Sequence, residues 1–143
     1  MKKRIYFIHS RKINYNDEIY LPVLRSKVLH NHDLMLPESE SLKDKYYKDL
    51  INMADIIVVD LTLPDIGFNM ELKQAILSHK PILALANKNV AFDEKYKKLL
   101  KNIYGYSNEE EFRDYVEKFA LKHESDPRSD VGTIILGDIK EDN

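Results

Sequence analysis

The sequence predicts a single flavodoxin-like (Rossmann-like) α/β domain, with a parallel sheet covered by helices on both faces. Short apolar runs without polar alternation recur along the chain, and between them the apolar residues repeat at the spacing of a helix. Strict alternation of strand and helix implies one parallel sheet with right-handed crossovers. The length of 143 residues, with 43% hydrophobic and 32% charged residues, suits one globular domain.

The strands are predicted from apolar runs of the kind that is buried on both faces of a parallel sheet. The strongest are 56–59, which is Ile-Ile-Val-Val between two aspartates, and 81–86, which opens on a proline. Residues 5–8 predict a first strand, 34–37 a weaker second and 102–106 a short fifth. Five strands favour the order 2-1-3-4-5, whose ligand crevice lies at the carboxyl ends of strands one and three.

Helical periodicity predicts five helices. The first covers about 16–29, begins near Asn16, which suits a cap, and contains Pro22, which weakens the prediction. The last follows a capping box in which Ser107 faces Glu110. The other helical segments are 43–53, 68–79 and 96–103, with 112–120 forming the last helix.

Charge and composition exclude several classes of protein. The 22 Lys and Arg against 24 Asp and Glu give a net charge of −2, so no basic excess draws the chain to nucleic acid or to a membrane surface. The absence of cysteine excludes a disulfide scaffold, a thiolate nucleophile and a cysteine-based zinc site. No apolar run approaches the ~20 residues of a membrane helix or suits a signal peptide. We therefore expect a cytoplasmic protein.

The character of the chain changes after Lys122. A polar, turn-like segment is followed by an apolar patch at 133–136 and a charged end. We expect residues 1–122 to form the α/β domain and 123–143 a polar tail that is mobile or packed on a neighbouring subunit.

Three acids, Asp60, Asp65 and Glu71, follow the third predicted strand and gather at the mouth of the expected crevice. Gly67 allows a tight turn, and Glu71 falls in or near the first turn of the next helix, four residues before Ala75, so it leans toward the sheet. The helix dipole favours its charged form, whereas nearby aspartates oppose it. Glycosyl transfer uses such a pair, with one carboxylate as nucleophile and one acid as proton donor. Acids in a first helical turn are also common because they stabilise the helix.

The segment 54–72, Ala-Asp-Ile-Ile-Val-Val-Asp-Leu-Thr-Leu-Pro-Asp-Ile-Gly-Phe-Asn-Met-Glu-Leu, followed by Lys-Pro-Ile at 80–82, resembles the nucleoside 2-deoxyribosyltransferase family. That family includes the related deoxynucleoside 5′-monophosphate N-glycosidases. Residues 4–7 resemble its first strand, which carries an active-site tyrosine, and the resemblance covers residues 4 to about 87. It implies a nucleoside or nucleobase as small-molecule partner, no cofactor, and a homo-oligomer whose subunits complete each other's sites. Residues 133–136 would cover a neighbour's crevice.

The resemblance also implies residue roles. Glu71 matches the nucleophile that attacks C1′ of the deoxyribose and forms a covalent deoxyribosyl-glutamate, and Tyr6 would donate a hydrogen bond that orients it. Asp65 matches the residue that holds a sugar hydroxyl, where the monophosphate glycosidases typically have a serine that contacts phosphate. Because a carboxylate repels a phosphate, Asp65 favours a nucleoside substrate.

The sequence departs from the family pattern at three places. His9 and Ser10 follow the first strand where the family has a glycine-containing loop, and Asn69 stands where glycine is frequent. Tyr47 occupies the place of the acid that protonates the base, with Asp49 two positions away. The proton donor is therefore expected to be Asp49 or Asp60.

Further candidates for substrate binding each have a structural alternative. His9 lies at the crevice, or is a polar plug that a backbone carbonyl satisfies. Tyr47 suits stacking on a base, or helix packing. Asn87 follows the fourth strand and suits a sugar or base contact, or a turn.

Two other functions remain open from the sequence. One is a nucleoside- or nucleotide-binding module of the same fold without turnover. The other is a NAD-cleaving domain of the Toll/interleukin-receptor type, because residues 6–10 faintly resemble its first strand and loop. The sequence contains no dinucleotide-binding glycine motif, phosphate loop, nucleophile elbow or evident set of metal ligands.

Overall fold

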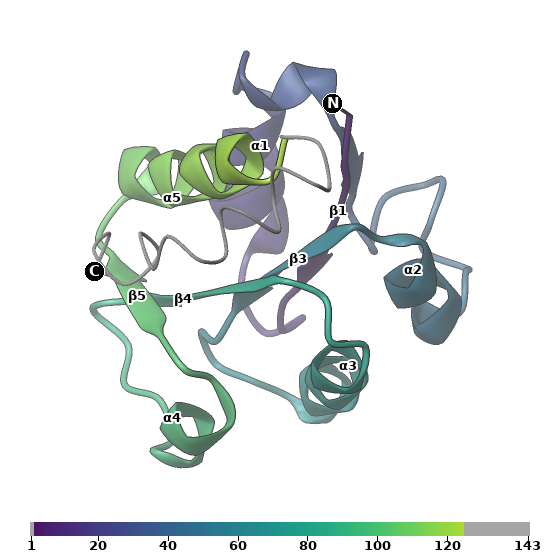
Figure 1. Ribbon diagram of the computed structural model, residues 1–143. Helices are drawn as coiled ribbons and strands as arrows, with labels where there is room; N and C mark the ends of the chain where they lie inside the picture. Colours follow the sequence, from purple (N-terminus) through teal and green to yellow (C-terminus); the bar gives the residue numbers. More distant parts are fainter. Residues whose placement is uncertain (1, 125–143) are drawn as a thin grey trace.

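The computed structural model describes residues 2–124, which contain a five-stranded parallel sheet of order β2-β1-β3-β4-β5 (Figure 1). This confirms the predicted fold class and strand order. The predicted tail, with its apolar patch at 133–136, lies outside the described residues. The strands are β1 (Arg4–Ile8), β2 (Asp33–Met35), β3 (Ile56–Asp60), β4 (Ile82–Asn87) and β5 (Ile103–Tyr106). The α-helices are α1 (Leu21–Leu24), α2 (Tyr47–Met53), α3 (Ile66–Leu77), α4 (Lys95–Leu99) and α5 (Glu109–Lys122).

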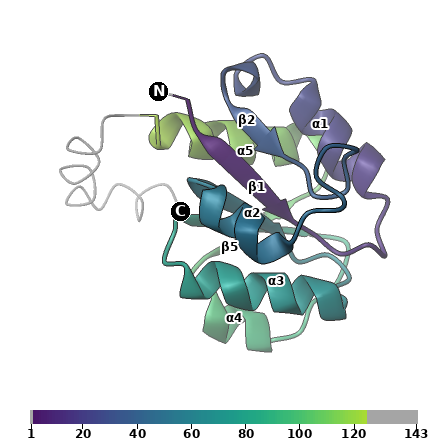
Figure 2. The same cartoon turned by 90° about the vertical axis from the view of Figure 1, so that its right-hand side faces the viewer.

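Helices cover both faces of the sheet, with α1 and α5 on one face and α2 and α3 on the other (Figures 1 and 2). The alternation of side chains along a strand divides the core accordingly. In β1, Ile5 and Phe7 pack in the cluster that includes α1 and α5, whereas Tyr6 and Ile8 pack in the cluster that includes α2 and α3. All four side chains are buried, which explains why the run does not alternate with polar residues.

The predicted helix over 16–29 is interrupted. It consists of one π-helical turn, η1 (Asn16–Tyr20), the short α1 and, farther along, one 3₁₀ turn, η2 (Leu29–Asn31). Pro22 lies in the first turn of α1, where its missing N–H is tolerated. The expected cap at Asn16 is wrong, because the capping position falls on Tyr15, which makes no side-chain capping bond.

Other helix boundaries also differ from the periodic pattern. The cap of α5 is Asn108 rather than Ser107, and its side chain accepts a hydrogen bond from the Glu111 backbone N–H at 2.9 Å. The Glu111 carboxylate in turn accepts from the Ser107 backbone N–H, so the predicted capping box is displaced by one residue. The helix predicted over 43–53 begins at Tyr47.

Lys80, which precedes β4, caps the C-terminal end of α2. Its Nζ donates hydrogen bonds of 2.6 Å to the carbonyl oxygens of Ile51, Asn52 and Ala54. Carbonyls at a helix C-terminus have no partner within the helix, and a cation there satisfies them. The Lys-Pro start of the strand thus has a structural role. No helix within residues 2–124 has both the length and the apolar character to span a membrane.

Candidate active site

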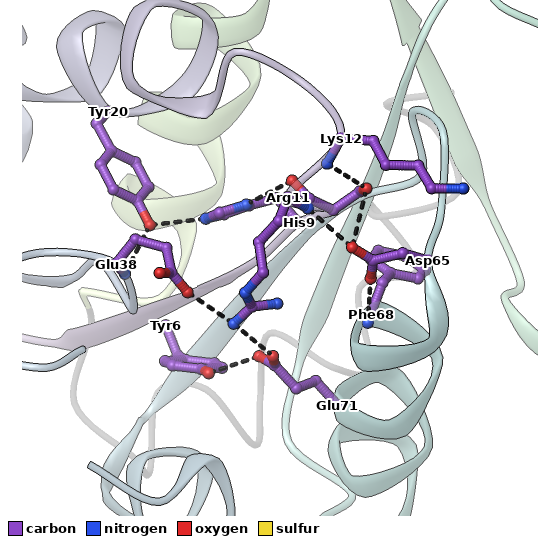
Figure 3. A network of polar contacts seen from close by, with 10 residues as sticks. Tyr6, His9, Arg11, Lys12, Tyr20, Glu38, Asp65, Phe68 and Glu71 are labelled. Atoms are coloured by element: carbon purple, nitrogen blue, oxygen red, sulfur yellow. Dashed lines mark hydrogen bonds and ion pairs between the residues drawn. The ribbon is translucent and has the colours of Figure 1, made fainter. Parts of the chain in front are cut away.

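A buried carboxylate lies at the carboxyl edge of the sheet, between β1 and the helix that follows β3 (Figure 3). Tyr6 Oη donates a 2.6 Å hydrogen bond to Oε1 of Glu71, and the whole Glu71 residue is 4% exposed. Glu71 shares the sheet-facing side of α3 with Phe68, Leu72 and Ala75, all buried, as its helical spacing predicts. The predicted hydrogen bond between Tyr6 and Glu71 is therefore present.

Arg11 covers the other oxygen of this carboxylate. Its Nη2 lies 3.5 Å from Oε2 of Glu71 and 2.7 Å from Oε2 of Glu38, so one guanidinium bridges two acids (Figure 3). The Arg11 side chain is 43% exposed and that of Glu71 5%. A charged, solvent-facing side chain, rather than packed hydrocarbon, thus separates Glu71 from water.

Asp65 ties the loop after β1 to the start of α3. As the cap of α3, its Oδ1 accepts from the Phe68 backbone N–H at 2.7 Å. Its Oδ2 accepts from the Arg11 backbone N–H at 3.0 Å and from Ser10 Oγ at 3.3 Å. Partial burial of Asp65 acts to raise its pKa, but these hydrogen bonds outweigh it and hold the pKa below its usual value.

Gly67, in the first turn of α3, has no side chain and so leaves room for the guanidinium of Arg11. A Cβ atom at this position would lie 3.3 Å from Nη1 of Arg11, closer than ordinary side-chain contact. Any larger residue here would press on Arg11. The glycine of the Asp-Ile-Gly turn therefore sets how closely Arg11 approaches the helix.

The electrostatics of Glu71 differ from the expectation based on the helix dipole. Glu71 is in the second turn of α3, beyond the reach of the free amides at its start. Burial raises the pKa of its carboxyl group, and the hydrogen bond from Tyr6 and the charge of Arg11 counter this only in part. The uncharged form is thus favoured more than in an exposed glutamate, and burial, rather than the dipole or the aspartates weighed from the sequence, is the main cause.

His9 and Ser10 support the loop that carries Arg11. His9 Nδ1 lies 3.0 Å from the Ser10 carbonyl oxygen, and its Nε2 lies 2.7 Å from the hydroxyl of Tyr20. Burial lowers the pKa of His9, which favours the neutral ring. Tyr20 Oη also accepts from the Glu38 backbone N–H at 2.9 Å, so this chain of contacts links the loop after β1 with the loop after β2. The contacts suit the structural reading of His9 as a satisfied polar group.

Asp60 lies on the opposite face of the sheet from Glu71. Its carboxylate accepts from Tyr106 Oη at 2.5 Å and from the Thr62 backbone N–H at 2.8 Å, and it follows Val58 by two residues in the cluster of α1 and α5. Burial raises the pKa of Asp60 despite these hydrogen bonds. The raised pKa suits a proton donor, but the structure does not bring Asp60 together with Glu71.

The buried Asp60 leads to a stability prediction. Because its pKa is raised in the folded protein, the folded state binds the proton more tightly than the unfolded state, and Asp60 weakens the fold as pH rises between the two pKa values. We expect Asp60→Asn to raise the free energy of unfolding at neutral pH, with a difference from wild type that shrinks as pH falls through the raised pKa. Urea denaturation across a pH series measures this, with the exposed Asp49→Asn as control. A less stable Asp60→Asn protein at neutral pH would contradict the assignment.

The remaining predicted residues lie apart from the Tyr6–Glu71 pair. Asp49 is exposed in the first turn of α2 and makes no contact with Glu71, while Tyr47 is half-buried against the core. Asn69 accepts a 2.6 Å hydrogen bond from Tyr96 Oη. Asn87 accepts from the Asn89 backbone N–H at 2.9 Å, which fits its alternative reading as a turn residue.

Sequence reasoning missed two charged residues of the site, Arg11 and Glu38. Each follows a strand, β1 or β2, at the carboxyl ends of the parallel strands, and β1 is one of the two strands between which the strand order reverses and ligand crevices of this fold form. Their position after these strands was the sequence signal that could have identified them. Their contacts with each other and with Glu71 depend on the conformations of the loops after β1 and β2, which a periodic pattern does not encode.

A separate cavity of about 710 Å³ lies where β4 and β5 begin, at the other edge of the sheet. Its described lining combines apolar side chains with Lys80, Lys101, Lys118 and Lys122, and includes no acid. The carboxylate nucleophile that the sequence predicts is therefore missing from that lining, and the candidate chemistry stays at Glu71. Within residues 2–124, no three His, Asp or Glu side chains are grouped as metal ligands would be.

Comparison with solved structures finds a relative of the fold. The CMP N-glycosidase BcmB of Clostridium botulinum matches with a TM-score of 0.57 and 18% sequence identity, over 80% of this chain and 99% of that one. No protein-family model and no curated protein matches the sequence. At this identity the likeness establishes the fold.

Proposed function

We propose that this protein breaks the N-glycosidic bond of a 2′-deoxynucleoside, with Glu71 as the nucleophile. The observation that carries the proposal is the buried Glu71 carboxylate, oriented by a 2.6 Å hydrogen bond from Tyr6 beside the carboxyl ends of the parallel strands, where sheets of this kind bind ligands. The fold likeness to a CMP N-glycosidase supports the same class of reaction. The resemblance of residues 54–72 to the deoxyribosyltransferases supports deoxyribose as the sugar.

The reaction can be written for the groups at the site. Tyr6 holds Oε1, so Oε2 of Glu71 attacks C1′ while the bond from C1′ to the base breaks, and its electron pair leaves with the base nitrogen. Water, or a second base, then attacks C1′ and releases the Glu71 carboxylate. Positioning of the sugar against a fixed carboxylate supplies much of the acceleration.

Asp65 supports an unphosphorylated substrate. Its carboxylate already accepts hydrogen bonds from the Phe68 backbone N–H, a free amide at the start of α3 of the kind that binds phosphate, and from the Arg11 backbone N–H. The lowered pKa of Asp65 keeps it charged at neutral pH, and this charge repels a 5′-phosphate.

Asp65→Ser is expected to shift preference toward nucleoside monophosphates. The change removes the negative charge and frees the Arg11 backbone N–H, so the ratio of kcat/KM for the monophosphate to that for the nucleoside should rise at least ~10-fold, about 1.4 kcal/mol. Asp65→Asn, which removes the charge but keeps an acceptor for Phe68, is the matched variant. An unchanged ratio in both variants would separate Asp65 from substrate choice.

The proposed function is tested by incubating the protein with the common 2′-deoxynucleosides and their 5′-monophosphates, with and without an added free base. Released base is measured by chromatography, and intact-mass analysis detects a deoxyribosyl adduct. We expect base release from at least one nucleoside and an adduct that disappears as the reaction ends. Base release from none of them would refute the proposal, and nicotinamide release from NAD would instead favour the NAD-cleaving alternative.

A second candidate is a binding module without turnover. The observation that favours it is the Arg11 guanidinium, which lies on Oε2 of Glu71 and partly neutralises the attacking group. Calorimetric binding of a nucleoside, with no released base and no adduct, would support this reading over catalysis.

A further inference from the structure

The proposed reaction needs a partner for the departing base, and the acids expected for that step do not contact Glu71. When the bond from C1′ breaks, negative charge develops on the base nitrogen unless a proton arrives. Asp60 is on the opposite face of the sheet, and Asp49 lies exposed on α2. In the described part of the chain, Glu38 is joined to Glu71 only through Arg11, with which it forms an ion pair.

Arg11 is on the side of Glu71 from which a base would leave. In a displacement at C1′, the leaving nitrogen departs on the side away from the attacking oxygen. Arg11 lies against that oxygen, Oε2, and is far more exposed than Glu71, so it lies between the carboxylate and the solvent. A sugar that enters between the two groups therefore pushes the guanidinium outward, toward the base.

The guanidinium is anchored so that it can leave Oε2 and remain at the mouth of the site. Its contact with Glu38, at 2.7 Å, is much shorter than its contact with Glu71, at 3.5 Å. Asp65 fixes the Arg11 backbone, and Gly67 leaves room beside Nη1. Loss of the longer contact leaves both anchors in place.

We propose that Arg11 stabilises the departing base as an anion, in place of a proton donor. This inference rests on the proposed cleavage by Glu71. The C1′–N bond breaks with its electron pair on the base, the guanidinium keeps all its protons and pairs with the negative charge, and the water that later attacks C1′ supplies the proton that neutralises the base. The preferred substrates are deoxynucleosides whose base spreads negative charge over neighbouring carbonyl groups, as uracil and thymine do, rather than adenine.

The test compares 2′-deoxyuridine with 5-fluoro-2′-deoxyuridine, whose base is a better anionic leaving group, in the full-length protein. We expect Arg11→Met to lower kcat for deoxyuridine by ~100-fold and to lower it less for the fluorinated substrate, so that the ratio of the two rates rises roughly 10-fold. Arg11→Lys, which keeps the charge, should restore much of this loss. Lys12→Met removes an equal charge from the same loop and should leave the ratio unchanged.

The outcomes separate the two proposals. Base release with the same ratio in wild type and Arg11→Met overturns the role of Arg11 alone, as does faster cleavage of deoxyadenosine than of deoxyuridine. A larger change of the ratio in Glu38→Gln than in Arg11→Met would assign the leaving group to a carboxylic acid instead. Absence of base release from every deoxynucleoside overturns the proposed function, and with it the role of Arg11.

Discussion

Replacing Glu71 by glutamine is expected to lower base release by at least ~10³-fold, because the amide cannot form the bond to C1′. The fold should survive. Glutamine has the same shape, can still accept the hydrogen bond from Tyr6, and removes a carboxyl group whose burial raises its pKa. Steady-state assays of base release and thermal unfolding measure the two expectations. Equal turnover in wild type and Glu71→Gln would remove Glu71 from the mechanism.

Two companion measurements sharpen this result. Tyr6→Phe keeps the carboxylate but removes the hydrogen bond that orients it, so a smaller loss of base release, roughly 10–100-fold, is expected.

The pH dependence of the reaction tests the protonation state of Glu71. Because the attacking form of Glu71 is the charged one and burial raises its pKa, kcat/KM should fall as pH drops through a value above the pKa of an ordinary glutamate. A profile that stays flat to the usual glutamate range would count against Glu71 as the attacking group.

Truncating Phe68 to alanine is expected to lower the free energy of unfolding by about 3–5 kcal/mol. Phe68 is fully buried on the sheet-facing side of α3, and its ring packs edge-on against Tyr96 with centroids 6.0 Å apart. A loss of that size is a large part of the ~5–15 kcal/mol that stabilises a typical domain. Urea denaturation measures it.

Phe68→Ala should also affect the geometry of the candidate active site. Phe68 is one turn from Glu71 and packs α3 against the sheet. Without its ring, α3 is held less firmly, and we expect the hydrogen bond between Tyr6 and Glu71 to weaken. Phe92→Ala, at a half-buried position on the edge of the same cluster, is the matched control and should lower stability less. Equal losses in the two variants would show that α3 is not held by Phe68.

Much of the fold follows from local pattern. The apolar run at 56–59 has no polar alternation because both of its faces are buried, and the spacing of Phe68, Leu72 and Ala75 is that of one helix face. The pattern failed at 16–29, because Pro22 starts a new short helix there, and at the cap of α5, where neighbouring Ser107 and Asn108 both suit a cap.

The candidate site could be predicted in part. The approach of Tyr6 to Glu71 was expected from the family resemblance, and the lean of Glu71 toward the sheet from its spacing. The separation of Asp60 from Glu71 was not foreseen, although the two residues are close in sequence. Asp60 ends β3 on the face that α1 and α5 cover, whereas Glu71 belongs to α3, which covers the other face.

The sequence by itself determined the order of strands and helices and the place of Glu71 on a buried helix face, because these depend on periodicities that neighbouring residues impose. Only the tertiary structure decided that Arg11 and Glu38 join Glu71 and that burial raises its pKa. Those contacts connect loops and helices that are distant in sequence, and their energies depend on distance and on exclusion of water, neither of which a local pattern contains.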